Sequence, residues 1–416
     1  MNKTFKFSAL AIAAALALTA CDKKDTNTPA AASAPASAAS AATDASSIGT
    51  PTQQASYAMG MDIGRSLKQM KDQGAEIDMK VFIEAMQASY EGKENKMTEA
   101  QAQEVMMKFL TEQQTKAAEK LKGLNKKHVS HLNYATVQGL LARVKMVENK
   151  WADAKEAALQ AINASKCKIL KIEGFRGLNN AKADNVLWGM EIKADQSGGW
   201  ANFFSHMDTL QYGERAPKQI SQTLYAKMNT TDDRRKWWNP HSHFNTFDGA
   251  QVKSGYQQDK FHFANPKEGT GDYIFMRVEE MYLTAAEAAC RLGDDAEAKK
   301  YLMELMKMRD PKYTTDKTGT ELGKVSSQEK GSLLEEIITQ RRIELWGEFG
   351  RMNDLRRLRQ GFRRTAADGW TMASYLLKTR PTEDPESYMW VLTIPQSEFD
   401  GNVNMKADTD QNPMGD

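Results

Sequence analysis

The segment from Ile337 to Leu358 reads I-I-T-Q-R-R-I-E-L-W-G-E-F-G-R-M-N-D-L-R-R-L, with arginine and glutamate interleaved among apolar residues. The apolar residues recur at roughly helical spacing as far as Phe349. Arginine stems cover apolar surface while their guanidinium groups form two-pronged bonds to carboxylates. The segment therefore predicts a helix that packs tightly against other helices through ion pairs. A purely structural role is the plainest interpretation, because charged helix faces are usually solvated or paired.

The same segment resembles the E-R-R-x-E-L-x-x-E-G-x-R-x-x-D-L-R-R signature of the SusD/RagB-like nutrient-binding lipoproteins of the outer membrane. Other segments resemble that family in the same order along the chain. Two of them are expected to form tetratricopeptide-like helical hairpins, and a third resembles the family's closing W-x-x-P-I-P-x-x-E strand. In order, they are T-V-Q-G-L-L-A-R-V (136–144) with W-A-D-A-K-E-A-A (151–158), M-R-V-E-E-M-Y-L-T-A-A-E-A (276–288) with residues 294–308, and W-V-L-T-I-P-Q-S-E-F-D (390–400).

Residues 53–122 are interpreted as three amphipathic helices. The second helix is expected to start after Asp78, a good N-cap, and the third at the capping-box pattern Thr98-x-x-Gln101. The sequence S-Y-A-M-G-M-D-I-G-R-S-L and the two helices after it resemble the N-terminal dimerisation domain of FKBP-type peptidyl-prolyl isomerases. A module of this size buries only a small core by itself, and burial against a partner is therefore expected. We accordingly expect a homodimer through residues 53–122. Beyond Lys122 the motifs of the FKBP catalytic barrel are not recognisable.

The first residues carry the features of a processing signal. Lys3 and Lys6 precede an apolar stretch, and small residues lead up to Cys21. This pattern predicts a lipoprotein signal peptide over 1–20 and acylation of Cys21, with a plain secretory signal as the alternative. Residues 21–52 are rich in alanine and serine and are expected to form a disordered tether. The acyl chains would anchor the protein to the outer membrane of a Gram-negative bacterium.

Together these segments predict a mostly α fold. An N-terminal three-helix dimerisation module at 53–122 precedes a SusD-like domain at 133–416. That domain is expected to be a tetratricopeptide-type helical repeat with an irregular region of loops and short strands. The resemblance also implies a departure, because the family normally carries further helical repeats where the FKBP-type helices stand here. The chain therefore looks chimeric.

Composition and motifs argue against several other classes of protein. Lys plus Arg is 56 and Asp plus Glu is 54, so the net charge of +2 offers no global field for nucleic acid. No P-loop, H-E-x-x-H or G-x-S-x-G motif occurs, so neither catalytic residues nor a cofactor are expected. His241-x-His243 lacks a third ligand at a known spacing, so no metal site is expected. Cys167 and Cys290 could pair in an oxidising envelope, but the apolar surroundings of Cys290 favour a buried free thiol.

The region from Leu187 to Phe263 breaks the helical pattern with glycine and proline and is dense in aromatic residues. Aromatic rings cover the apolar faces of sugars, while amides, carboxylates and guanidinium groups bind hydroxyls. The alternative is that most of these rings form the core of the loops. The predicted ligand-binding residues are Trp200, Trp237, Trp238 and Tyr256, with Asp232, Arg234, Asn239 and Asn245 as polar partners.

The SusD resemblance implies a non-catalytic protein that captures an oligosaccharide or a peptide nutrient. It also implies a TonB-dependent outer-membrane transporter as the partner that receives the ligand. The N-terminal module suggests an alternative from another class, a peptidyl-prolyl cis-trans isomerase or periplasmic folding factor. A third alternative is a fusion without function.

Overall fold

The computed structural model divides the chain into two compact units, Met1–Lys96 and Met97–Asp416, here called the N-terminal and the C-terminal unit. The predicted signal peptide, Cys21 and most of the predicted tether lie outside the described residues. None of the helices in the described ranges is both long enough and apolar enough to cross a membrane. The structure describes residues 48–72, 75–124, 128–198, 201–209, 218–241, 244–245, 251–252, 255–348, 350–363, 382–387, 390–402 and 405–412.

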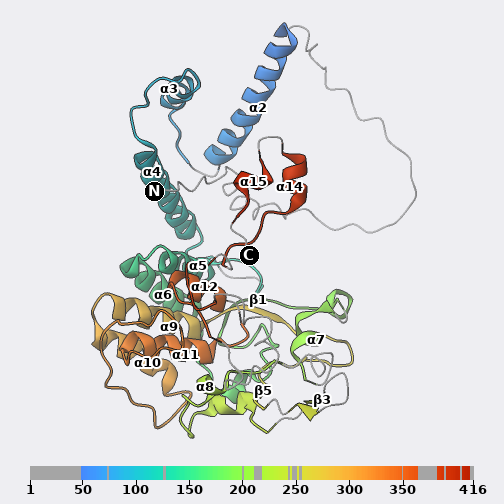
Figure 1. The fold of residues 1–416 in the computed structure, drawn as a ribbon, viewed down its shortest axis with the longest axis vertical. Helices are drawn as coiled ribbons and strands as arrows, with labels where there is room; N and C mark the ends of the chain where they lie inside the picture. The colour runs from blue at the N-terminus through green and yellow to red at the C-terminus, as the bar shows by residue number, and fades with distance from the viewer. Residues whose placement is uncertain are drawn as a thin grey trace, which may run out of the picture. The chain divides into compact units, whose positions relative to one another are not determined.

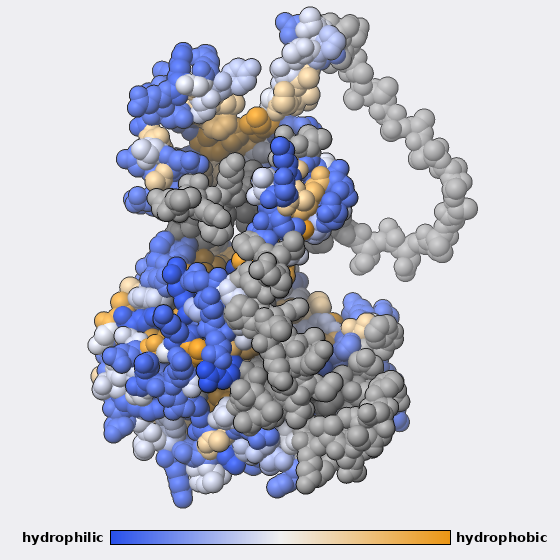
Figure 2. All heavy atoms as spheres, viewed as in Figure 1, coloured by the Kyte–Doolittle hydropathy of each residue, from blue (hydrophilic) through white to orange (hydrophobic). Residues whose placement is uncertain are grey.

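The N-terminal unit contains helices α2 (Pro51–Asp72) and α3 (Met79–Tyr90). Asp78 caps α3 as predicted, because its carboxylate accepts hydrogen bonds from the backbone N–H groups of the second and third residues of the helix. Neither helix contains a buried residue. Tyr57 and Met61, one helical turn apart, are 58% and 50% exposed, and Figure 2 shows apolar surface on these helices. The two helices therefore present an apolar stripe that their own packing leaves uncovered.

The C-terminal unit begins with α4 (Glu99–Lys120), the third predicted helix of the N-terminal module. Its first turn is closed by the predicted capping box. The Thr98 hydroxyl accepts from the Gln101 backbone N–H, and the Gln101 side chain accepts from the Thr98 N–H. Three helices between Pro51 and Lys120 confirm the prediction of a helical module in this part of the chain.

Two helical pairs then form the scaffold of the C-terminal unit, as the sequence predicted (Figure 1). Helix α6 packs on α9, and α11 packs on the other side of the same buried helix. Fully buried Ala158, Ala161, Ala286 and Ala289 allow the helices to approach closely. The first pair is α5 (Tyr134–Val147) with α6 (Trp151–Ser165), and the second is α9 (Val278–Arg291) with α10 (Asp295–Met306). Helices α11 (Leu333–Glu344) and α12 (Arg351–Arg357) follow them in the chain.

Between the two pairs lies the predicted region of loops and short strands. Its longest ladder pairs β1 (Val186–Met190) with β6 (Tyr273–Arg277), antiparallel. Shorter antiparallel ladders pair β2 with β5 and β3 with β4. The remaining elements are β2 (Trp238–Asn239), β3 (Phe244–Asn245), β4 (Gln251–Val252), β5 (Gln257–Gln258), α7 (Phe203–Met207), α8 (Gln222–Tyr225), and the 3₁₀ helices η3 (Ile172–Phe175), η4 (Ala194–Gln196) and η7 (Asp233–Trp237).

Two local predictions are wrong. The signature segment is not one helix, because α11 ends at Glu344 and α12 starts at Arg351. Gly347 (φ 73°) and Gly350 (φ 128°) adopt backbone conformations that interrupt a right-handed helix between them. The closing segment is not a strand either: α14 (Gln396–Gly401) follows Pro395, whose fixed φ of −59° suits the entry to a helix. A last short helix, α15, spans Ala407–Asp410.

Candidate functional site

The signature segment supplies the centre of a buried charge network. Arg309 donates from Nε and Nη2 to the two carboxylate oxygens of Glu344, at 2.9 Å each. Arg277 Nη1 donates to the same carboxylate at 3.1 Å. Burial alone would raise the pKa of Glu344, but the guanidinium groups of Arg309 and Arg277 hold it far below its usual range. All three side chains are fully buried, so this network joins α10, α11 and β6 without reaching solvent.

The network is balanced in charge. Its cations are Arg234, Lys260, Arg277 and Arg309, and its acids are Asp232, Glu279, Glu344 and Glu348. Every cation has a carboxylate within 3.1 Å, so each buried charge is compensated. Here and below it is called the balanced cluster. A closed and neutral cluster of this kind suits a role in fold stability.

Two predicted ligand contacts belong to the balanced cluster. Arg234 is completely buried and Asp232 is 4% exposed. Arg234 Nη2 donates to Asp232 Oδ2 at 2.7 Å. Both side chains are therefore directed at each other inside the fold, away from solvent. That they bind a ligand stays a prediction, and this placement does not favour it.

The predicted aromatic contacts are also packed inside the loops. Trp237 and Trp238 are 4% and 2% exposed and meet edge to face, with ring centroids 5.9 Å apart. The Lys260 ammonium lies 4.6 Å from the centroid of the Trp237 ring, and Trp346 packs edge-on against Trp238 at 5.8 Å. Neither indole leaves an open face for a sugar in this structure, which agrees with the alternative of a loop core.

The remaining candidates do not join these rings in one open site. Tyr256 is half-buried, and its ring centroid lies 4.9 Å from that of Tyr225. Asn239 is exposed, and its side-chain oxygen accepts from the His241 N–H at 2.9 Å. Trp200 and the side chain of Asn245 lie outside the described residues. Ligand binding by these residues therefore stays a prediction.

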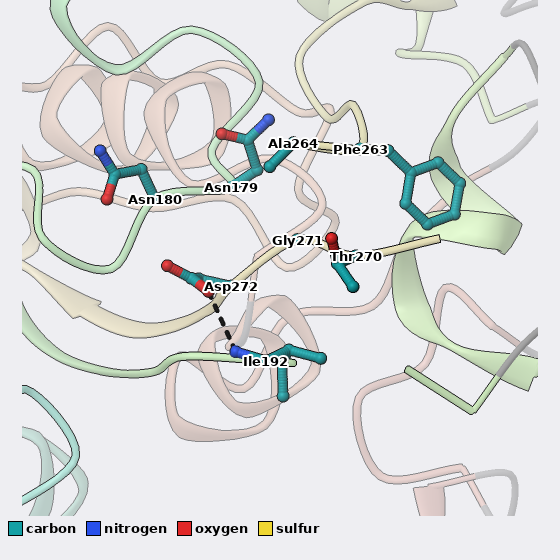
Figure 3. A pocket seen from close by; sticks show the side chains of 8 residues that line it. All are labelled: Asn179, Asn180, Ile192, Phe263, Ala264, Thr270, Gly271 and Asp272. Atoms are coloured by element: carbon teal, nitrogen blue, oxygen red, sulfur yellow. Dashed lines mark hydrogen bonds between the residues drawn. The ribbon is translucent and has the colours of Figure 1, made fainter. Parts of the chain in front are cut away.

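A cleft of about 380 Å³ opens elsewhere in the same irregular region, lined mainly by small and polar residues (Figure 3). Its residues come from two stretches that are distant in the sequence, 179–192 and 263–272, which the fold of the C-terminal unit brings together. They are Asn179, Asn180, Ile192, Phe263, Ala264, Thr270, Gly271 and Asp272. None of them is among the ligand contacts predicted from the sequence.

Asp272 ties the walls of the cleft together. Its Oδ2 accepts from the Ala181 N–H at 2.9 Å, and its Oδ1 accepts from the Ile192 N–H at 3.0 Å, the bond drawn in Figure 3. The Asn179 side chain adds a third tie, because its Nδ2 donates to the carbonyl of His262 at 2.9 Å. Charge-assisted bonds to backbone groups hold loops firmly, so the cleft is a preformed feature of the fold.

Several polar atoms of the cleft keep free hydrogen-bonding capacity. Asn180 is exposed, and its Oδ1 accepts from the Lys182 N–H, which leaves Nδ2 without a partner in the described part of the chain. Asn179 Oδ1 and the Thr270 hydroxyl likewise make no hydrogen bond that the described residues provide. The cleft therefore offers both donors and acceptors to a ligand.

Aromatic rings stand beside this polar surface. The ring of Phe204 lies behind Gly271, where a Cβ atom would come within 2.7 Å of it. Phe203 is 38% exposed and packs edge-on against Tyr273, the residue after Asp272. Within the cleft itself, Phe263 lies among the amides of Asn179 and Asn180 and the Asp272 carboxylate, and such a mixture of ring and polar groups suits a polyhydroxylated ligand. The sequence offers two features that could have pointed to this cleft, the pair Asn179-Asn180 and the turn at Gly269–Gly271. Both are equally typical of ordinary loops, so neither identifies a binding site.

Comparison with known families gives two separate matches. The SusD family model matches residues 202–414. The model of the domain amino terminal to FKBP-type peptidyl-prolyl isomerase matches residues 52–139. Over 70 residues the chain is 83% identical to the probable FKBP-type peptidyl-prolyl cis-trans isomerase FkpA of Neisseria meningitidis serogroup B, which is 17% of this chain and 26% of that protein.

Solved structures resemble the chain in fold. A SusD superfamily protein of Bacteroides thetaiotaomicron has a TM-score of 0.57 at 21% identity, covering 74% of this chain and 66% of that one. A Bacteroides vulgatus protein with a proposed sugar-binding role has a TM-score of 0.54 at 22% identity, covering 74% of this chain and 64% of that one. The chain thus spans just under two thirds of these structures and about a quarter of the Neisseria protein.

Proposed function

Because this chain belongs to the SusD family, whose model matches residues 202–414, we propose that it is a non-catalytic protein that binds an oligosaccharide. The observation that carries this proposal is the preformed cleft at Asn179, Asn180 and Asp272, which the aromatic residue Phe263 also lines. Sugars present hydroxyl groups and apolar C–H faces together, and this surface offers partners for both. A peptide is the other ligand that the family resemblance implies.

The cleft supports binding better than hydrolysis. Asp272 is the one carboxylate among its lining residues, and both oxygens of Asp272 already accept backbone hydrogen bonds. Hydrolysis of a glycosidic bond ordinarily requires two carboxyl groups that face each other across the bond. A ligand held here would meet hydrogen-bonding groups and a ring, but no such pair. We therefore assign the cleft to capture and not to turnover.

Binding can be tested with the purified full chain on an oligosaccharide array, followed by calorimetric titration of the best ligand. Removing both cleft amides, Asn179→Ala with Asn180→Ala, should weaken binding by about tenfold or more, since each lost hydrogen bond contributes about 1 kcal/mol. Asn163→Ala is the matched control, because Asn163 is an exposed amide on α6, outside the cleft and not among the predicted ligand contacts. Equal affinity of the double variant and the control would refute the cleft as the site.

We further propose that the protein works at the outer membrane and passes its ligand to a TonB-dependent transporter. This rests on the family and on the lipobox-like sequence that ends at Cys21. Cys21→Ser should leave the protein in the soluble fraction after cell lysis, while the wild-type chain should sediment with membranes. Membrane retention of the Cys21→Ser chain would contradict acylation at this position. Co-purification with a transporter from solubilised membranes tests the partner.

A homodimer through residues 53–122 is the third part of the proposal. The uncovered apolar stripe of α2 supports it, because exposed apolar surface of this kind marks interaction sites. The similarity to the Neisseria protein over 70 residues points to the same N-terminal domain. A dimer would also present two binding clefts from one anchored particle, which raises the avidity for a repetitive glycan.

The similarity to the Neisseria protein favours a second candidate, a prolyl isomerase or folding factor. The matched domain is described as lying amino terminal to the isomerase, so it is a distinct part of such proteins. A proline-isomerisation assay separates the two candidates: turnover above the uncatalysed rate would favour the enzyme. A fusion without function is the third alternative. Limited proteolysis would reveal it as one stable and one degraded fragment.

A further inference from the structure

A second group of buried charges differs from the balanced cluster because its charges do not balance. Its carboxylates are each held by arginines: Glu280 by Arg143 at 2.9 Å, Asp354 by Arg341 at 3.1 Å, and Glu287 by Arg357 at 2.8 Å. The arginines of this group, here called the excess-arginine cluster, are Arg143, Arg291, Arg341, Arg342, Arg351 and Arg357, and its acids are Glu280, Glu287 and Asp354.

Six guanidinium groups therefore face three carboxylates in the excess-arginine cluster. Glu335 is one further acid that acts on Arg342 over a longer distance. Even when it is included, two positive charges stay uncompensated among the described residues. A partly buried group of cations with this excess is costly unless an anion joins it.

The excess is located at Arg342 and Arg351. Arg342 Nη1 donates to the backbone carbonyl of Ser326 at 3.2 Å, a neutral acceptor. Arg351 Nη1 is buried, and no described residue provides it with a hydrogen-bond partner. Every arginine of the balanced cluster, by contrast, has a carboxylate partner. Each of the two residues as a whole is half-buried, so neither is sealed in the interior.

The surroundings of both groups disfavour their charged form. Burial, followed by the positive charge of Arg342, lowers the pKa of Arg351 to about 9. Burial likewise lowers the pKa of Arg342. Asp354 acts to raise the pKa of Arg351, and Glu335 acts to raise the pKa of Arg342. Neither acid outweighs the lowering of the pKa by burial. An anion between the two guanidinium groups would reverse both shifts.

We propose that Arg342 and Arg351 form an oxyanion-binding site, which takes a sulfate, phosphate or carboxylate group. A planar guanidinium matches two oxygens of such a group at once, and the buried Nη1 of Arg351 supplies a donor that no other residue in the described ranges uses. The site shares no residue with the cleft at Asn179 and Asp272. It would therefore hold a separate small anion or the acidic group of a larger ligand.

The test is a calorimetric titration of the purified full chain with sodium sulfate, with sodium chloride at equal ionic strength as the reference. Wild type should bind one sulfate per chain, and Arg351→Gln and Arg342→Gln should each weaken binding by about tenfold or more. Arg356→Gln is the matched control, because Arg356 lies exposed on the same short helix and loses the same charge. It should bind sulfate like the wild type.

Phosphate and glucuronate, titrated in the same way, identify which oxyanion the site prefers, and saturable binding of any one that requires Arg351 supports the proposal. Two results would overturn it: no saturable binding of any of the three anions by wild type, or equal loss in the Arg356→Gln control. Folding is monitored by circular dichroism. If Arg351→Gln fails to fold, Arg342→Gln decides, because its guanidinium has a neutral backbone partner instead of a carboxylate.

Discussion

Arg309 and Glu344 form two parallel hydrogen bonds of 2.9 Å each, although 35 residues separate them in the sequence. This pair connects the end of α10 to the end of α11 in a place without solvent. The signature segment thus stabilises the scaffold that carries the cleft, and the charge of its Glu344 is structural. The cleft is assembled from loops between the helices of this scaffold.

Removing the charge of Glu344 should strongly destabilise the C-terminal unit. In Glu344→Gln the buried guanidinium groups of Arg277 and Arg309 lose their shared carboxylate, which leaves uncompensated charge in the interior. The expected cost is about 3–5 kcal/mol in the free energy of unfolding, measured by urea titration. Glu304→Gln is the control, since Glu304 pairs with Lys307 on the surface, and it should change stability by less than about 1 kcal/mol.

His262 predicts a pH dependence with a definite sign. Hydrogen bonds to Asp208 and Asp259 raise the pKa of His262 from 6.5 to about 9. The folded protein therefore keeps a proton that the unfolded chain releases, so the stabilisation is complete below pH 6.5 and is lost as the pH rises through 9. Between pH 6.5 and pH 8, the contribution of His262 to the free energy of unfolding should fall by at most roughly 2 kcal/mol.

The measurement is the free energy of unfolding across this pH range in wild type and His262→Gln. The variant should lack this part of the pH dependence. The exposed His241 provides the control, and His241→Gln should follow wild type. Above pH 8 Lys260 acts in the opposite sense, because burial lowers its pKa to about 8, so data below pH 8 are the decisive ones. A His262→Gln curve that parallels wild type would contradict the assignment.

Gly347 should tolerate no side chain. Its φ is 73°, and a Cβ atom would lie 2.6 Å from the ring of Phe261. Gly347→Ala should lower the free energy of unfolding by about 1 kcal/mol because of the backbone conformation, and by a further 1–3 kcal/mol because of overpacking against the ring. Gly293→Ala separates the two effects, because Gly293 has a φ of 83° with no atom within 4 Å of the added Cβ. Equal costs for both variants, measured by urea unfolding, would exclude the clash.

The proposed dimer should depend on the apolar stripe of α2. Replacing Tyr57 and Met61 together by glutamate places charges in the proposed interface, so the protein should sediment as a monomer in analytical ultracentrifugation. Ser66→Glu adds a charge on the opposite face of the same helix and should leave the dimer intact. Dimers in the double variant, or monomers in the wild type at micromolar concentration, would contradict the interface.

Local signals predicted the helices well. Asp78 and the pair Thr98–Gln101 fix helix starts through bonds to groups two or three residues away, so the sequence alone specifies them. The break between α11 and α12 lies at Gly347 and Gly350, whose positive φ values interrupt the helix, and Gly347 also approaches the ring of Phe261, a residue far away in the sequence. Apolar spacing could not reveal it, because the pattern continues through the turn.

The site was harder to predict for the same physical reason. Asp272 joins loops that lie 80 or more residues earlier in the chain, and this joining creates the cleft. Trp237 and Trp238 were predicted to contact a ligand, but an aromatic residue in a loop can equally well pack in the core, and the sequence alone does not distinguish the two. Their burial against Lys260 and Trp346 depends on tertiary contacts that no local pattern records.

The most direct test of sugar capture by the C-terminal unit is a crystal structure of the full chain with the oligosaccharide that binds best on the array. We predict sugar hydroxyls within hydrogen-bonding distance of Asn180 Nδ2 and Asn179 Oδ1, with the glycan intact. A sugar bound at another surface while the cleft stays empty, or a cleaved glycan in the cleft, would contradict the account.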